Sequence, residues 1–156
     1  MASDFSHINF YHRTGIQIRF NDIDMLQHVN NTIYQNYFDS ARFLYFKQVM
    51  EIDRFLSHQW VVLANISIDF VEPVLVDDFI EVQTKIVAFG TKSLTMYQQI
   101  CAIDGSGQRV KTRSSSVLVG YSLDTAETVA ISNEWKDCIA RYERDIDFGI
   151  SSSKSQ

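Results

Sequence analysis

The stretch of sequence that decides the fold is residues 19–46, RFNDIDMLQHVNNTIYQNYFDSARFLYF. From Thr32 onward its apolar residues recur at steps of three and four, which predicts an amphipathic helix. The stripe consists of Tyr34, Tyr37, Phe38, Ala41, Leu44 and Tyr45, and it is widened by Phe43 and Phe46. Because a short side-chain oxygen can accept from the first free N–H groups of a helix, Asn30 or Asn31 is expected to cap its start. A helix with so wide an apolar stripe should be buried on several sides.

On either side of this helix the pattern changes to that of strands and turns. Gly15–Phe20 alternates apolar and polar residues, and Asn21–Asn31 is a polar loop that fits neither period. Four more strands are predicted after the helix, at Trp60–Phe70, Asp78–Phe89, Ser93–Ile103 and Gln108–Tyr121. Residues 104–107, DGSG, predict a hairpin turn, and residues 135–142 predict a final helix capped by Ser132 or Asn133. Tight turns require antiparallel neighbours, so the predicted fold class is α+β, with one long helix across one antiparallel sheet.

Length and composition predict a single domain. The chain has 156 residues, and we assign residues 1–156 to one domain with a core at about 13–146 and a polar tail at 151–156. Residues 1–12 are interpreted as an adaptable lead-in. The aromatic share of 13% means that large rings fill much of the core.

Charge and cysteine content argue against several classes of protein. A net charge of −5 without Lys/Arg clusters is poorly suited to binding nucleic acid. Cys101 and Cys138 lie far apart, and the histidines lack metal-binding spacing, so no metal and no cofactor are expected. The sequence has no signal-peptide pattern and no apolar run of roughly 18 residues. We therefore expect a cytoplasmic protein that does not enter the membrane.

The run Arg19–Tyr34 resembles the signature of the 4-hydroxybenzoyl-CoA thioesterase family. Further matches follow at residues 68–74, IDFVEPV, at Asp77-Asp78 and at residues 90–93, GTKS, so the resemblance covers roughly residues 15–121. It implies a hot-dog fold, in which a curled antiparallel sheet wraps around a long central helix, and it implies hydrolysis of an acyl-CoA thioester. One departure is Gln27, where the family most often has Gly, a residue that takes positive φ without steric cost.

The resemblance also implies which residues act. Asp24 occupies the position of the catalytic carboxylate, as a general base or as a nucleophile, and the backbone N–H of Asn31 is the donor that polarises the thioester carbonyl. Asp22, His28 and Asn30 are predicted to support the loop, and Tyr34 to line an acyl pocket. Candidate contacts for the phosphates of CoA are Lys92, Ser93, Arg109, Lys111 and Arg113, with Lys111 and Arg113 expected on one face of a strand.

Three functional hypotheses remain open at the level of the sequence. The first is an acyl-CoA thioesterase, the second an enzyme that hydrolyses acyl groups on acyl carrier protein, and the third a non-catalytic hot-dog module that binds acyl ligands or partner proteins. The resemblance further implies a homodimer or homotetramer, paired through sheet edges with the site between subunits.

Overall fold

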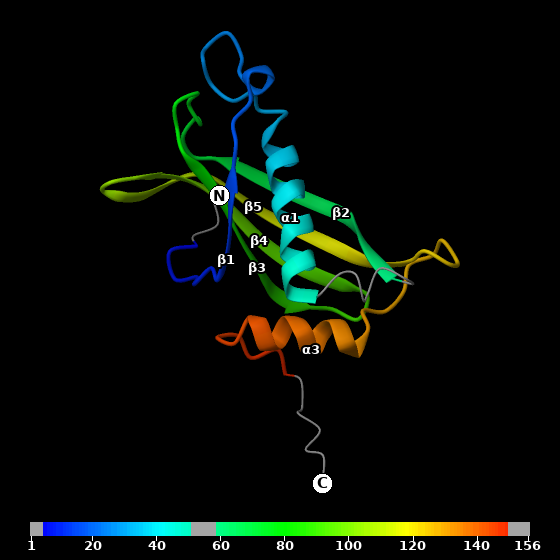
Figure 1. The fold of residues 1–156 in the computed structure, drawn as a ribbon. Helices are drawn as coiled ribbons and strands as arrows, with labels where there is room; N and C mark the ends of the chain where they lie inside the picture. The colour runs from blue at the N-terminus through cyan, green and yellow to red at the C-terminus, as the bar shows by residue number, and fades with distance from the viewer. Residues whose placement is uncertain (1–4, 51–58, 150–156) are drawn as a thin grey trace.

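The structure is a computed structural model, and it describes residues 5–50 and 59–149. Along the chain it contains β1 (His12–Ile16), the 3-10 helix η1 (Phe20–Asp22), α1 (Tyr34–Met50), β2 (Gln59–Phe70), β3 (Ile80–Phe89), β4 (Ser93–Asp104), β5 (Gly107–Ser122) and α3 (Asn133–Tyr142) (Figure 1). The predicted polar tail at 151–156 lies outside the described residues.

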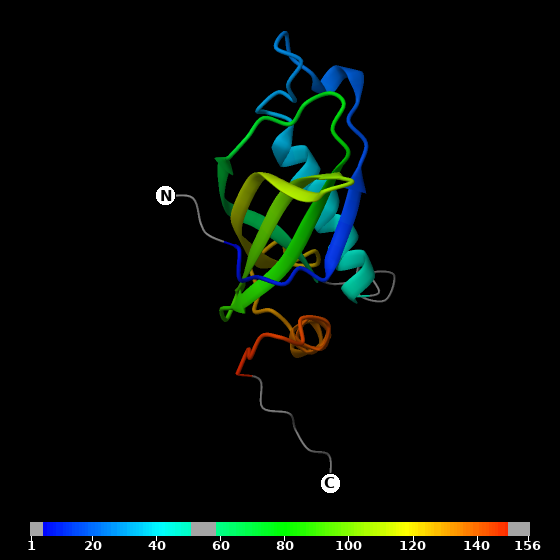
Figure 2. The ribbon, with the colours of Figure 1, turned by 90° about the vertical axis from the view of Figure 1, so that its left-hand side faces the viewer.

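The strands form one antiparallel sheet in the order β1-β3-β4-β5-β2. It curls around α1, which crosses its inner face, while α3 lies beyond one end of the sheet (Figures 1 and 2). This arrangement confirms the predicted α+β class. Among the described strands, only β3-β4 and β4-β5 are hairpins between sequence neighbours. The segment at residues 71–79 is longer, and it carries the chain from β2 at one edge to β3 near the other.

The first predicted strand is displaced along the sequence. It was expected at Gly15–Phe20, but β1 is His12–Ile16, and Phe20 belongs to η1 with 93% of its surface exposed. The cause is local, because the carboxylate of Asp22 accepts the backbone N–H of Arg19 at 3.0 Å and bends the chain into a turn. Hydrogen bonds of the loop's polar groups therefore end the strand before the residues that the alternating pattern assigned to it.

The apolar stripe of α1 supplies the core in two parts. Tyr34, Tyr37, Phe38 and Ala41 pack in one cluster with sheet residues that include Val82 and Ile100. Tyr45 and Phe46 pack in a second cluster that includes Leu118 and Trp135. Two predicted members of the stripe are not buried in the core, since Phe43 is 48% exposed and Leu44 is 40% exposed. The stripe is therefore narrower than the sequence suggests.

The lead-in packs against the sheet where the structure describes it. Phe5 and Phe10 are buried, and the Phe5 ring stacks on Tyr97 of β4 with centroids 4.6 Å apart. His12 already belongs to β1. The segment covers part of the sheet face that points away from α1.

A buried ammonium group ties the lead-in and the residues after α3 to the sheet. Lys85 of β3 is 1% exposed, and its Nζ donates to Glu143 at 3.0 Å, to Asp145 at 2.7 Å and to the carbonyl of Asn9 at 2.8 Å. Tyr45 of α1 donates to the other oxygen of Glu143 at 2.8 Å. Burial raises the pKa of Glu143, and hydrogen bonds from Tyr45 and Lys85 partly offset that effect.

Replacing this ammonium group should destabilise the fold. Lys85→Met leaves the buried carboxylate of Glu143 and the partly buried one of Asp145 without their cation, so the free energy of unfolding should fall by about 3–5 kcal/mol. Chemical denaturation of Lys85→Met and of Lys92→Met, which alters an exposed side chain, measures the difference. Equal stability of the two variants would contradict the structural role of Lys85.

Candidate functional site

The loop that carries Asp24 is closed by its own hydrogen bonds. The N–H of Asp24 donates to the carbonyl of His28 at 2.9 Å, and the N–H of Gln27 donates to the carbonyl of Asp24 at 3.1 Å. The Asp24 carboxylate accepts two backbone N–H groups on Oδ1, from Leu26 at 2.9 Å and from His28 at 3.3 Å. Within residues 5–50 and 59–149, Oδ2 of Asp24 accepts no hydrogen bond from the protein. The loop thus fixes the side chain and leaves one oxygen available.

Gln27 resolves the one departure from the family pattern. Its φ is 60°, in the left-handed region that favours glycine. The loop therefore keeps a conformation that suits glycine and accommodates Gln at some cost in strain. The carbonyl of Gln27 accepts the N–H of Val76 at 3.3 Å, which ties this turn to the segment that follows β2.

Asp22 lies beneath the loop and is 1% exposed. Its carboxylate accepts the Tyr37 hydroxyl at 2.6 Å and the Arg19 N–H at 3.0 Å, and the Arg19 guanidinium lies 3.5 Å from its other oxygen. Its carbonyl accepts the N–H of Asn30 at 2.8 Å. Burial alone would raise the pKa of Asp22, but the hydrogen bonds from Tyr37 and Arg19 and the charge of Arg19 outweigh it and lower this pKa. These contacts are what the predicted supporting role requires.

The start of α1 faces the Asp24 carboxylate across the loop. The helix begins at Tyr34, later than the predicted Thr32, and a turn at residues 31–33 leads into it. Asn30 organises that turn, because its Oδ1 accepts the N–H of Thr32 at 3.0 Å and the Thr32 hydroxyl at 2.8 Å. Asn31 is exposed, and its N–H donates to no acceptor in the part of the chain that the structure describes. A backbone donor at a helix N-terminus is suited to stabilising negative charge.

Asp24 and Asn31 line the same cavity, of about 280 Å³. Other walls come from Leu26, His28, Tyr34 and Pro73. The Tyr34 hydroxyl accepts the N–H of Val74 at 3.0 Å, and burial raises the pKa of Tyr34. Tyr34 is therefore a fixed wall of the cavity.

The candidate phosphate contacts do not gather around this cavity. Lys111 is buried, and its Nζ lies 3.3 Å from Glu72, 3.5 Å from Asp78 and 3.1 Å from the carbonyl of Pro73. Arg109 pairs with Glu72 at 3.0 Å. The charges of both residues are thus already compensated. Lys92 and Ser93 lie at the turn between β3 and β4, where Lys92 is exposed.

The expectation that Lys111 and Arg113 share a face is wrong. The β4-β5 register shifts at a bulge, where Thr112 pairs with Ile100 and Val110 pairs with Cys101. The extra residue is Lys111, which turns toward the segment after β2, whereas Arg113 lines a cavity beside the lead-in. A bulge breaks the alternation on which the expectation depended.

The site has no metal-binding or membrane-spanning feature in the described ranges. No group of three His, Cys, Asp or Glu side chains there could hold a metal ion. None of the helices there is long and apolar enough to cross a membrane.

Comparison with known proteins identifies the family. The family model of the Thioesterase-like superfamily matches residues 18–139, which include β2 to β5, the Asp24 loop and α1. The chain belongs to the thioesterase-like superfamily. This thioesterase is 24% identical over 132 residues to the long-chain acyl-CoA thioesterase FadM of Escherichia coli, a match that covers 80% of the chain and 94% of FadM.

Solved structures support the assignment. A thioesterase from Thermus thermophilus, crystallised with coenzyme A and Zn, is 27% identical, with a TM-score of 0.73 over 86% of this chain and 96% of that one. A thioesterase-superfamily protein from Jannaschia has a TM-score of 0.79 at 18% identity, over 90% of this chain and 87% of that one. These findings confirm the hot-dog fold, and the protein is a thioester hydrolase.

One residue of the site was not assigned from the sequence. Tyr37 was placed in the apolar stripe, as a core residue that could also line an acyl pocket, with no hydrogen-bonding role, yet its hydroxyl holds Asp22 beneath the loop of the thioesterase. Its position one turn after Tyr34 on the same helical face was the available signal, because a buried tyrosine usually finds a hydrogen-bond partner.

Relieving the strain at Gln27 should stabilise the thioesterase. A left-handed conformation costs a non-glycine residue about 1–2 kcal/mol, and glycine loses roughly 0.5–1 kcal/mol more chain entropy on folding. Gln27→Gly should therefore raise the free energy of unfolding by about 0.5–1 kcal/mol. Gln27→Ala, which keeps a Cβ, is the control and should bring no gain. Equal gains from both variants would show that strain is not the cause.

Removing the charge at Asp22 should cost stability in a pH-dependent way. Asp22→Asn weakens hydrogen bonds made to a carboxylate, so we expect a loss of about 1–3 kcal/mol at neutral pH. Because the pKa of Asp22 is lowered by folding, its contribution is complete above the ordinary Asp pKa of about 4 and is lost as the pH falls below it. Denaturation curves should therefore converge with the native protein in acid. Asp137→Asn, an exposed substitution on α3, should show no such convergence.

Proposed function

We propose that the thioesterase hydrolyses acyl-CoA thioesters, with Asp24 as the catalytic carboxylate and the N–H of Asn31 as the oxyanion donor. One observation carries this proposal. Both residues line one cavity, and each has a group that forms no hydrogen bond with the described residues, Oδ2 on Asp24 and the N–H on Asn31. A carbonyl placed between them would meet an attacking group and a donor together.

The relatives support CoA as the carrier. FadM is a long-chain acyl-CoA thioesterase, and the Thermus thermophilus thioesterase was crystallised with coenzyme A. The Tyr34 wall and the neighbouring Leu26 make one side of the cavity suitable for the acyl group. Of the five candidate contacts for the CoA phosphates, Lys111 and Arg109 are already paired and Arg113 lines a separate cavity, so Lys92 and Ser93 remain.

Two routes use the same atoms. As a general base, Asp24 takes a proton from water while the water oxygen attacks the thioester carbonyl, and the resulting oxyanion is held by the Asn31 N–H. When the C–S bond breaks, the proton returns to the thiolate, giving CoA and the free acid. As a nucleophile, Asp24 Oδ2 attacks the carbonyl itself and expels the thiolate, and water then cleaves the mixed anhydride. Oδ1 stays bound to two N–H groups, so only Oδ2 serves either route.

The site is also proposed to be completed by a second copy of the chain. β2 lies at one edge of the sheet, so one side of its backbone is unpaired within the described sheet. Exposed apolar residues also surround the cavity, with Leu26 71% exposed and Met25 fully exposed. Pairing of two β2 edges would supply hydrogen-bond partners for that backbone and place residues of the partner copy near the site. The chain would then assemble as a homodimer or a homotetramer.

The role of Asp24 is tested by thiol release from a panel of acyl-CoAs with short, long and aromatic acyl groups. Asp24→Asn keeps the size of the side chain but removes the base, so turnover should fall by about 10²–10⁴-fold. Asp137→Asn on α3 is the matched control and should keep native turnover. A folded Asp24→Asn protein with undiminished activity would overturn the assignment. Faster release from the same acyl groups on acyl carrier protein would instead identify the protein carrier as the substrate.

A further inference from the structure

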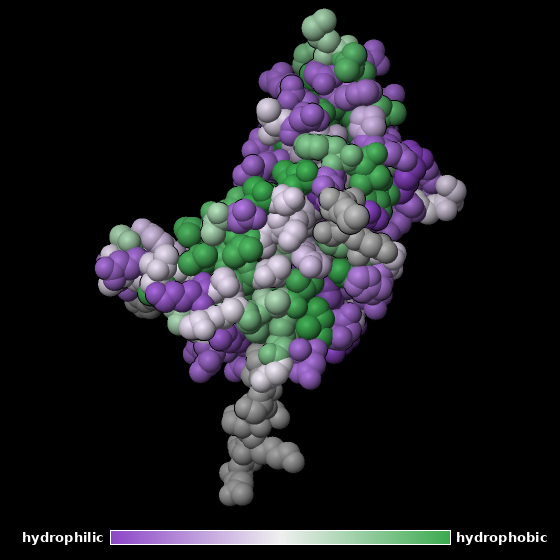
Figure 3. All heavy atoms as spheres, turned by 180° about the vertical axis from the view of Figure 1, so that it is seen from behind, coloured by the Kyte–Doolittle hydropathy of each residue, from purple (hydrophilic) through white to green (hydrophobic). Residues whose placement is uncertain are grey.

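A second cavity, of about 500 Å³, lies on the face of the sheet that points away from α1. Its floor is formed by β1, β3, β4 and β5, and the lead-in at residues 5–11 forms one wall. It shares no lining residue with the Asp24 cavity. Seen from this side, the surface of the molecule mixes hydrophobic and hydrophilic residues (Figure 3). Its volume falls within the range of small-molecule sites, about 300–1,000 Å³.

The floor of this cavity contains a row of polar side chains that crosses four strands. Arg13 of β1 pairs in register with Gln83 of β3, Gln83 pairs with Gln99 of β4, and Gln99 pairs with Arg113 of β5. Residues directly opposite each other on antiparallel strands point to the same face. Two guanidinium groups therefore lie at the ends of the row, with two amides between them.

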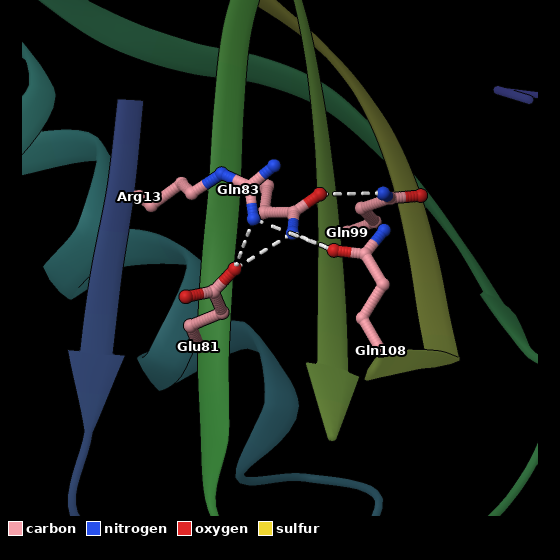
Figure 4. A network of polar contacts seen from close by, with 5 residues as sticks. All are labelled: Arg13, Glu81, Gln83, Gln99 and Gln108. Atoms are coloured by element: carbon pink, nitrogen blue, oxygen red, sulfur yellow. Dashed lines mark hydrogen bonds and ion pairs between the residues drawn. The ribbon is translucent and has the colours of Figure 1, made fainter. Parts of the chain in front are cut away.

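A charged pair fixes the direction of the hydrogen bonds in this row. The carboxylate of Glu81 accepts from Arg13 at 3.0 Å and from the Gln83 side-chain nitrogen at 2.7 Å. That nitrogen also donates to Gln108 at 2.8 Å. Because a carboxylate only accepts, the Gln83 oxygen must face the other way, and it accepts the Gln99 side-chain nitrogen at 2.7 Å. The side-chain oxygen of Gln99, Oε1, points away from this network (Figure 4).

Gln99 thus presents an acceptor that the described protein does not satisfy. Its side chain is 5% exposed, and its Oε1 receives no hydrogen bond from residues 5–50 or 59–149. This oxygen is not among the fully buried unpartnered atoms, so it is accessible from the cavity that Gln99 lines. A ligand donor in the cavity would supply a hydrogen-bond partner.

Arg113 presents the complementary group beside it. Its Nε is buried without a hydrogen-bond partner, and its guanidinium carbon lies 5.9 Å from the centroid of the Phe5 ring. Asp69 of β2 is its register neighbour, yet the two form no ion pair in the described structure. Among the described residues the guanidinium charge is therefore uncompensated, and it lies on the strand next to Gln99, whereas Arg13 at the far end is paired with Glu81 at 3.0 Å.

We propose that this cavity is a binding site for a small hydroxylated organic anion. A carboxylate or phosphate of the ligand accepts from Arg113, and an adjacent hydroxyl donates to Gln99 Oε1. Burial of the Gln99 side chain and the fixed orientation of the Gln83 amide make the acceptor rigid. The same chemistry is found in free hydroxy acids and sugar phosphates and in the ribose phosphate of coenzyme A.

Nuclear magnetic resonance of the side-chain amides locates binding in the unaltered protein. Citrate and glycerol 3-phosphate should shift the amide signals of Gln99 and Gln83 and leave those of Asn30 and Asn31, at the Asp24 cavity, in place. Coenzyme A that shifts Gln99 in the same way would identify its ribose phosphate as the source of the anion. No shift of Gln99 with any of these probes at millimolar concentration, or an equal shift with acetate at matched ionic strength, overturns the proposal.

Variants test the groups that hold the anion. Arg113→Gln removes charge-assisted hydrogen bonds and should weaken binding of the best probe about tenfold or more. Arg109→Gln, on the same strand but paired with Glu72 outside the cavity, should bind as the native protein does. Asp69→Asn removes a neighbouring negative charge and should bind the probe more tightly. Native affinity in Arg113→Gln overturns the proposal, and if that variant fails to fold, unchanged affinity in Asp69→Asn does so.

Discussion

The hydroxyl of Tyr37 donates a 2.6 Å hydrogen bond to the carboxylate of Asp22, and this contact joins the central helix to the loop that precedes it. The Asp22 carboxylate also accepts the N–H of Arg19, and the Asp22 backbone carbonyl accepts the N–H of Asn30. The two ends of the loop are therefore fixed to the first buried turns of α1. Because Asp24 and Asn31 lie on this loop and at its end, their relative position follows from one buried carboxylate.

The two aspartates show how environment divides roles between similar groups. Asp22 is buried and its hydrogen-bonding capacity is used by the protein, which suits a structural anion. Asp24 is two residues further on, bound through one oxygen only and open to a cavity. A carboxylate that is held in place by one oxygen and has no hydrogen bond to the other can accept a proton or attack a carbonyl. The same division applies to the basic residues, because Lys85 and Lys111 form internal ion pairs, whereas Arg113 forms none with the residues that the structure describes.

The sheet explains why two separate cavities are possible in so small a domain. Its inner face is filled by α1, so the Asp24 cavity opens only where the helix begins, beside the loop. Its outer face carries alternate residues of the same strands, and the lead-in covers part of that face with Phe5 and Phe10. Alternation along each strand sends apolar residues such as Val82 inward and polar residues such as Gln83 outward. One set of strands thus builds the core and the polar row.

The sequence by itself determined the long central helix, the antiparallel strands β2 to β5, the hairpin at residues 104–107 and the motif that places Asp24 before a helix. These are local properties, since periodicity, turn chemistry and a contiguous motif are all read within short windows. The tertiary structure decided the rest. Arg19–Asp22 contacts moved the first strand, and a bulge at Lys111 turned Lys111 and Arg113 to different faces. Distant partners buried Lys85 and fixed the orientation of the Gln99 amide. The Arg19–Asp22 contact spans only three residues, but periodicity does not encode it. The other outcomes depend on residues brought together from far apart in the chain, whose pairing no local pattern encodes.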